Sequence, residues 1–161
     1  MNVFDCAIKI EEEAQSYYEG LEAQSLEPKM KHLFSMLAAS EEEHRRRVQG
    51  LKQSVGPERA RLDELDGSIC RFRPLLTQRE LLEEVQNDPD LYKFTVREEE
   101  KEISFYEELA SLAGDEATRG SLLLLAEEER RHLSKVENIY AFVEAPRNYL
   151  VWGEFGNREE L

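Results

Sequence analysis

The feature that most constrains the fold is a repeat of the pattern L-A-x-x-E-x-x-H. The pattern occurs at residues 37–44 and returns at residues 125–132, a shift of 88 positions. At the same shift, E-x-x-x-x-x-[YF]-Y occurs at residues 11–18 and again at 99–106. A chain made of two copies of one helical hairpin has an approximate two-fold axis. Residues that are equivalent under that axis can converge on one central site.

Helical periodicity surrounds both copies and predicts an all-α fold. We expect helical hairpins at about 3–53 and 89–144, a crossover at about 54–88 and a short tail at 145–161. The crossover should contain a short helix, TQRELLEEV. Pro28 fits the first turn of the second helix, Asp88 or Asp90 can cap the third, which should end near Gly114, and Asp115 can cap the fourth. The fourth helix should end near Glu144, before Pro146. Two hairpins and a long crossover predict a single-domain, ferritin-like four-helix bundle over residues 1–161.

Glutamate and histidine interrupt the apolar stripe of the predicted helices. In the second helix, Glu41 and His44 fill the gap between Leu37 and Val48, at the spacing that keeps one face of a helix. The other three helices show the same interruption, with Glu11 in the first, Glu99 and Glu102 in the third, and Glu129 and His132 in the fourth. Several buried carboxylates without partners would cost more than the roughly 5–15 kcal/mol by which a domain is stable. No Lys or Arg occupies the same level of the stripes, so the pattern favours a bound metal.

A solvated helix face is the ordinary interpretation of any single glutamate, and a lone E-x-x-H is a weak signal. We expect seven other glutamates to be solvated in this way, namely Glu12, Glu13, Glu42, Glu43, Glu100, Glu127 and Glu128. His32 lies off the stripe and is expected on the surface. Two matched copies of the full pattern are much harder to obtain by chance, and they carry the prediction of a metal site.

One glutamate from each of two helices, with an E-x-x-H from each of the other two, is the constellation of di-iron carboxylate bundles. On these motifs the chain resembles the di-iron domain of the rubrerythrins, over helices one to four. The resemblance implies two iron ions, with Mn or Zn as possible substitutes. It implies terminal carboxylate ligands at Glu11 and Glu99, bridging carboxylates at Glu41 and Glu129, and histidine ligands at His44 and His132. Glu11 and His44 would then serve one ion, and Glu99 and His132 the other.

Glu102 has no counterpart in the first copy, where the equivalent residue is Ala14. Rubrerythrins have a similar additional glutamate, which competes with a histidine for one iron as the redox state changes. By this resemblance Glu102 and His44 would be the two sides of such an exchange, with a role for Glu102 in supporting a ligand as the alternative. Tyr18 and Tyr106 lie two turns beyond Glu11 and Glu99. They are expected to hydrogen-bond metal-bound carboxylates and to supply electrons or protons, or simply to pack in the core.

The function implied by the resemblance is the reduction of hydrogen peroxide to water in oxidative-stress defence. The alternatives are a ferroxidase or oxygen-reducing iron protein, and a bundle with a purely structural metal or an acidic interaction module. Rubrerythrins usually carry a rubredoxin domain with four cysteine ligands, whereas this sequence holds only Cys6 and Cys70. We therefore expect an external electron donor, such as a rubredoxin-like protein.

Composition narrows the partners and the location. The net charge is −14, which disfavours nucleic acid and anionic membranes because both require a basic surface. No apolar run is long enough to cross a bilayer, and the N-terminus lacks the features of a signal peptide, so a cytoplasmic protein is expected. Cys6 and Cys70 are far apart in sequence, which argues against a disulfide framework and favours buried, unreactive thiols. A homodimer is expected from surplus apolar residues in the crossover and tail, namely Phe72, Leu75, Leu76, Tyr149, Trp152 and Phe155.

Overall fold

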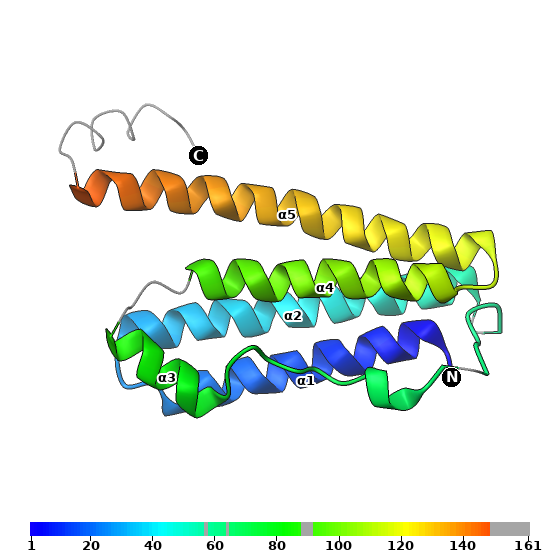
Figure 1. The fold of residues 1–161 in the computed structure, drawn as a ribbon, viewed down its shortest axis with the longest axis horizontal. Helices are drawn as coiled ribbons and strands as arrows, with labels where there is room; N and C mark the ends of the chain where they lie inside the picture. Colours follow the sequence, from blue (N-terminus) through cyan, green and yellow to red (C-terminus); the bar gives the residue numbers. More distant parts are fainter. Residues whose placement is uncertain (57, 64, 88–91, 149–161) are drawn as a thin grey trace.

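The computed structural model describes residues 1–56, 58–63, 65–87 and 92–148. Its elements are α1 (Val3–Gln24), α2 (Pro28–Val55), the 3-10 helix η1 (Gly67–Ile69), α3 (Gln78–Asn87), α4 (Tyr92–Leu112) and α5 (Glu116–Asn148). No strand occurs within these ranges, and the predicted all-α fold is confirmed. Figure 1 shows α1, α2, α4 and α5 side by side along their length, with the crossover and α3 running beside α1.

Local chemistry accounts for where the helices begin and end. The side chain of Asn2 caps α1 by accepting the N–H groups of Phe4 and Asp5, at 2.8 and 3.2 Å. Pro28 begins α2, and Gly56 ends it with φ at 97°, a conformation that side chains disfavour. Asp115 caps α5, as predicted, by accepting the N–H of Thr118 at 2.8 Å. The predicted caps Asp88 and Asp90 lie outside the described residues.

The last helix is longer than predicted. It continues through Pro146 to Asn148 instead of ending near Glu144. Proline cannot donate to the carbonyl four residues earlier, but its φ of about −65° is itself helical. In the final turn this costs only a little of the helical hydrogen bonding, so proline did not act as a stop.

Two apolar clusters form the core at different levels of the bundle. One gathers around Phe4, Val48, Tyr106 and Leu122, and the other around Tyr18, Leu21, Phe34 and Leu81. Along α1 and α2, the residues of the two clusters are separated by the positions of Glu11, Glu41 and His44. The clusters therefore enclose one polar layer in the middle of the bundle, with an apolar level on either side of it.

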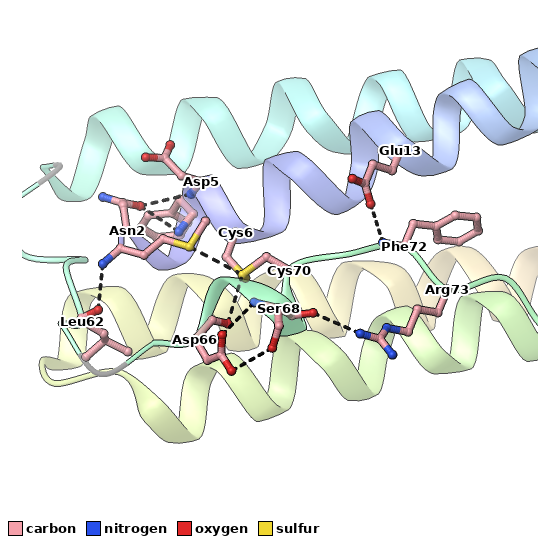
Figure 2. Close-up of a disulfide and its surroundings, with 12 residues drawn as sticks. Asn2, Asp5, Cys6, Glu13, Leu62, Asp66, Ser68, Cys70, Phe72 and Arg73 are labelled. Atoms are coloured by element: carbon pink, nitrogen blue, oxygen red, sulfur yellow. Dashed lines mark hydrogen bonds between the residues drawn. A yellow bond between two sulfur atoms is a disulfide. The ribbon is translucent and has the colours of Figure 1, made fainter.

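Cys6 and Cys70 form a disulfide, which contradicts the prediction of two separate thiols (Figure 2). It joins α1 to the residue that follows η1, across 64 positions of sequence, and both cysteines are fully buried. Spacing along the chain could not reveal the pair, because the crossover returns to α1 only in the folded protein. Disulfides persist mainly in oxidising compartments, so the bond lends no support to the predicted cytoplasmic location.

Hydrogen bonds also hold the crossover against the helices. Glu13 accepts the N–H of Phe72 at 2.8 Å, Glu98 accepts the N–H of Leu75 at 2.8 Å, and Tyr17 donates to the carbonyl of Leu76 at 2.6 Å. Glu13 therefore supports the crossover and is not merely solvated as predicted. Phe72 and Leu76 pack against the second cluster, so they are not surplus apolar surface.

The predicted dimer stays a prediction. Leu75 is 46% exposed, but Tyr149, Trp152 and Phe155 lie outside the described residues. Among the described helices, none combines the length and the apolar character that a membrane span requires.

Candidate metal centre

The polar layer brings together carboxylates from all four long helices. Glu11 of α1, Glu41 of α2, Glu99 of α4 and Glu129 of α5 are each at most 7% exposed. Each lies on the core face of its helix, because apolar residues one or two turns away direct that face inward. The interruptions of the apolar stripes therefore point into the bundle.

Two groups of side chains are compact enough to hold metal ions. In each group, one ligand atom from every member lies within 4.8 Å of the others. The first group contains Glu11, Glu41, His44 and Glu102, and the second contains His44, Glu99, Glu129 and His132. Glu11 and His44 fall in the first group, and Glu99 and His132 in the second. Glu41 and Glu129, the predicted bridging ligands, each fall in one group, whereas His44 falls in both, so the assignment of ligands to two ions stays a prediction.

His44 is the central residue of the layer. Its Nδ1 lies 3.0 Å from Glu102 Oε1 and 3.6 Å from oxygens of both Glu11 and Glu41. Its Nε2 lies 2.9 Å from Glu129 Oε1. The imidazole ring thus stands among four carboxylates, and Glu102 is the carboxylate nearest to Nδ1.

Several buried polar atoms in the layer have no hydrogen-bond partner within the described part of the chain. They are Oε2 of Glu11, Glu41, Glu99 and Glu129, together with Nδ1 of His44. Leaving a buried acceptor unpaired costs about 1–3 kcal/mol, and more for a charged group. Five such atoms converging on one layer fit the ligand set of a metal pair. Carboxylate oxygens with imidazole nitrogens suit Fe(II), Mn(II) or Zn(II).

The pKa values of the same layer indicate that its negative charges are unfavourable without a cation. Burial raises the pKa of Glu11 well above its usual value, and the nearby Glu102 and Glu41 raise it further. Burial likewise raises the pKa of Glu99, with Glu102, Glu41 and Glu129 adding to the effect. Burial alone would lower the pKa of His44, but the surrounding carboxylates, Glu102 foremost, leave it well above its usual value. These raised pKa values favour the protonated forms of the two carboxyl groups and of the imidazole.

The two tyrosines of the repeat have different environments. The hydroxyl of Tyr106 donates to Glu11 Oε1 at 2.5 Å and lies 3.4 Å from Glu102 Oε1. Tyr18 is buried and stacks edge-on against Tyr17, and we see no hydrogen bond from it to a carboxylate of the described chain. The pKa of Tyr106 is raised by burial and by the charge of Glu11. Only Tyr106 therefore has the predicted contact.

The two histidine positions also differ. His132 is exposed, although its ring lies 6.2 Å from that of His44, centroid to centroid. His32 is exposed on α2, as predicted.

The sequence pattern does not identify the residues that join the layer to the crossover. A cavity of about 410 Å³ lies between α1, α4 and the crossover, and it reaches Glu11, Glu41 and Glu102. Phe72, Lys101 and Phe105 line it, and the buried Glu98 lies beside it. Glu98 lies in a run of three glutamates at residues 98–100, and the repeat pattern marks only Glu99 among them.

Comparison with known proteins gave one match. The family model described as Rubrerythrin matches residues 2–140. Neither the curated proteins nor the solved structures include a match to this chain. The matched range contains every glutamate and histidine of the polar layer, on all four long helices.

Proposed function

Because the chain belongs to the rubrerythrin family of ferritin-like di-iron proteins, we propose that it reduces hydrogen peroxide to water. The observation that carries the proposal is the contact between Glu102 and His44. Glu102 Oε1 and His44 Nδ1 lie 3.0 Å apart, so both side chains could bind a metal ion at one position, beside Glu11 and Glu41. A metal ion there can be bound by one of them or by the other.

The proposed cofactor is a pair of iron ions, held by the two groups of the polar layer. Glu11, Glu41, His44 and Glu102 would hold one ion, and Glu99, Glu129 and His132 would hold the other. Mn or Zn ions can bind to such ligands, but zinc is redox-silent. When bound in the ferrous state, the pair supplies the two electrons that peroxide reduction requires.

The residues of the chain would orient the ligands and provide protons. Tyr106 holds Glu11 through its hydroxyl and is itself fully enclosed, which fixes the carboxylate in one orientation. The O–O bond of hydrogen peroxide would break with uptake of two electrons and two protons, giving two molecules of water. Tyr106 would donate or relay a proton through Glu11, and Tyr18 also lines the cavity.

The electrons would be replaced by an external donor, such as a rubredoxin-like protein. Both cysteines of this sequence are joined in the disulfide, so neither is left for a cysteine-ligated iron site. We also propose that the protein works as a homodimer in oxidative-stress defence.

The first experiment is stopped-flow oxidation of the ferrous protein. Protein loaded anaerobically with iron is mixed separately with hydrogen peroxide and with oxygen, while the absorption of the diferric product is followed. Fast oxidation by peroxide and slow oxidation by oxygen support the proposal. Faster oxidation by oxygen, with further uptake of iron, would assign the protein to the ferroxidases instead.

Substitution of Glu102 tests the residue on which the proposal rests. Glu102→Ala should slow oxidation by peroxide by about tenfold or more, the effect typical of residues that tune a metal site, while iron content stays close to that of the wild type. Glu100→Ala is the matched control, because Glu100 is an exposed glutamate two residues away on α4. Equal rates for wild type and Glu102→Ala would remove the argument for peroxide.

A further inference from the structure

The cavity beside the polar layer is much larger than hydrogen peroxide requires. Its volume is about 410 Å³, within the range of pockets that bind small organic molecules. Hydrogen peroxide has the size of two water molecules, or about 60 Å³ at ~30 Å³ for each water. A channel that served peroxide alone would need only a fraction of this space.

The walls of the cavity are mainly apolar. Ile10 and Ala14 of α1, Ile69 and Phe72 of the crossover, and Phe105 of α4 line it, in the same cavity as the carboxylates of the polar layer. Ile69 is 37% exposed. Apolar side chains that stay partly open to solvent gain free energy when an apolar ligand covers them, at about 25 cal/mol per Å². The path to the carboxylates therefore favours a ligand with a carbon chain.

The mouth of the cavity is basic in an acidic protein. Arg71 and Arg73 of the crossover and Lys101 of α4 are all exposed and line the cavity, in a chain of net charge −14. Lys101 Nζ lies over the Phe72 ring, 5.9 Å from its centre, so the cationic and apolar parts of the wall are adjacent. Five glutamates also line the cavity. Glu11, Glu41 and Glu102 belong to the polar layer, Glu98 accepts from the Leu75 N–H and from Lys101, and Glu108 is exposed. Three cations at one opening suit an anionic group on the ligand.

The crossover wall is firmly attached, so the cavity is a built feature. The disulfide joins Cys70 to α1, and Glu13 accepts the N–H of Phe72 on the other side of Arg71 (Figure 2). The guanidinium of Arg73 donates to the carbonyl of Ser68 at 3.2 Å. Residues 70–73 are thus fixed at both ends, and the opening keeps its shape.

We propose that the cavity binds an organic hydroperoxide that has an apolar chain and a carboxylate. The carboxylate lies at the mouth near Arg71, the chain covers Ile10, Ile69 and Phe72, and the hydroperoxide group reaches Glu102. This inference rests on the proposed peroxidase function and names its substrate class. The O–O bond of ROOH breaks, and two electrons from the ferrous pair with two protons yield ROH and water. The external donor returns the two electrons.

Binding is tested first, without turnover, in protein loaded with redox-silent zinc. Calorimetry with decanoate and with decanol separates the anionic group from the chain. We expect both to bind, and decanoate to bind more tightly. Arg71→Gln should weaken decanoate about two- to fivefold, the range of a solvent-accessible ion pair, and leave decanol unchanged. Arg79→Gln is the charge-matched control, because Arg79 lies on the exposed surface of α3.

The apolar wall is tested by a second pair of variants. Ile69→Gln should weaken decanoate and decanol alike, because it removes a carbon contact that both ligands use. Leu26→Gln is the control, since Leu26 is 97% exposed and does not line the cavity. If neither ligand binds to the wild type, or if Ile69→Gln and Arg71→Gln bind both as the wild type does, the inference is wrong.

Turnover then separates this inference from the proposed function. Ferrous protein is mixed with decanoate that carries a terminal hydroperoxide, and separately with hydrogen peroxide. A lower KM for the organic hydroperoxide supports the inference. Reaction with hydrogen peroxide alone would overturn it and leave the peroxidase proposal intact. Reaction with neither would overturn both, whatever the calorimetry shows.

Discussion

At the scale of single residues, the environment of a side chain distinguishes members of the repeat that the sequence treats as equivalent. Tyr18 and Tyr106 occupy the same position of the motif, but only Tyr106 donates to a carboxylate. His44 is enclosed by four carboxylates, whereas His132 is exposed. Such asymmetry gives the two halves of the proposed site different ligand strengths. The half near Glu102 and Tyr106 is the one that the cavity reaches.

Removal of the Tyr106 hydroxyl should weaken metal binding. In Tyr106→Phe the carboxylate of Glu11 loses its donor and its fixed orientation, and losses of this kind typically cost 10–100-fold in metal affinity. Competition with a colorimetric chelator for Zn²⁺ measures the change. Tyr18→Phe makes the same chemical change at the equivalent position, where no carboxylate is contacted, and should have a much smaller effect. Equal losses in the two variants would show that the hydrogen bond to Glu11 is unimportant.

At the scale of elements, the crossover does more than connect the two hairpins. It brings Cys70 to α1, covers the second apolar cluster with Phe72 and Leu76, and forms one wall of the cavity. Its attachment uses side chains that belong to neither ligand group of the polar layer, namely Glu13, Tyr17 and Glu98. The connection is therefore part of the site that the helices create.

The disulfide should contribute strongly to stability. A bond that closes a loop of 64 positions restricts the unfolded chain, with an expected contribution of about 4 kcal/mol to the free energy of unfolding. Urea denaturation of oxidised protein, of protein treated with a reductant and of Cys6→Ala/Cys70→Ala measures it. The reductant should destabilise the wild type and leave the double variant unchanged. Equal stability of oxidised and reduced wild type would contradict the prediction.

At the scale of the whole molecule, the bundle is organised around a layer that is unfavourable without a cation. Apolar clusters above and below the layer stabilise the fold, and the buried carboxylates oppose them. The raised pKa values of Glu11, Glu99 and His44 mean that the folded, metal-free protein holds protons that the unfolded chain releases. Folding, protonation and metal binding are therefore linked.

The metal-free protein should lose stability as the pH rises from 5 to 8. Glu11 and Glu99 keep protons above the unfolded value of 4.5, and His44 keeps its proton above the unfolded value of 6.5. The folded state therefore binds more protons than the unfolded chain throughout this range. Each additional bound proton lowers the free energy of unfolding by up to about 1.4 kcal/mol per pH unit. Urea denaturation at several pH values checks the slope. Glu99→Gln removes one titrating group and should flatten it.

Metal should reverse this dependence. The ligands must be deprotonated to bind a cation, so Zn²⁺ should stabilise the protein more at pH 8 than at pH 5. The same denaturation series with and without the ion gives the comparison. A metal-free protein whose stability rises with pH, or gains nothing from Zn²⁺ at pH 8, would contradict the linkage.

The sequence by itself determined the helices, the two-fold repeat and the glutamates and histidines that interrupt the apolar stripes. These features follow from a period of 3.6 residues, which acts over a few turns and is visible in a single chain. No such period reveals that Cys6 pairs with Cys70 or that His44 belongs to both ligand groups. Nor does it reveal that Tyr106, and not Tyr18, is the partner of Glu11. The cavity between α1, α4 and the crossover belongs with them. Only the tertiary structure decided them, because each depends on how segments far apart in sequence approach one another.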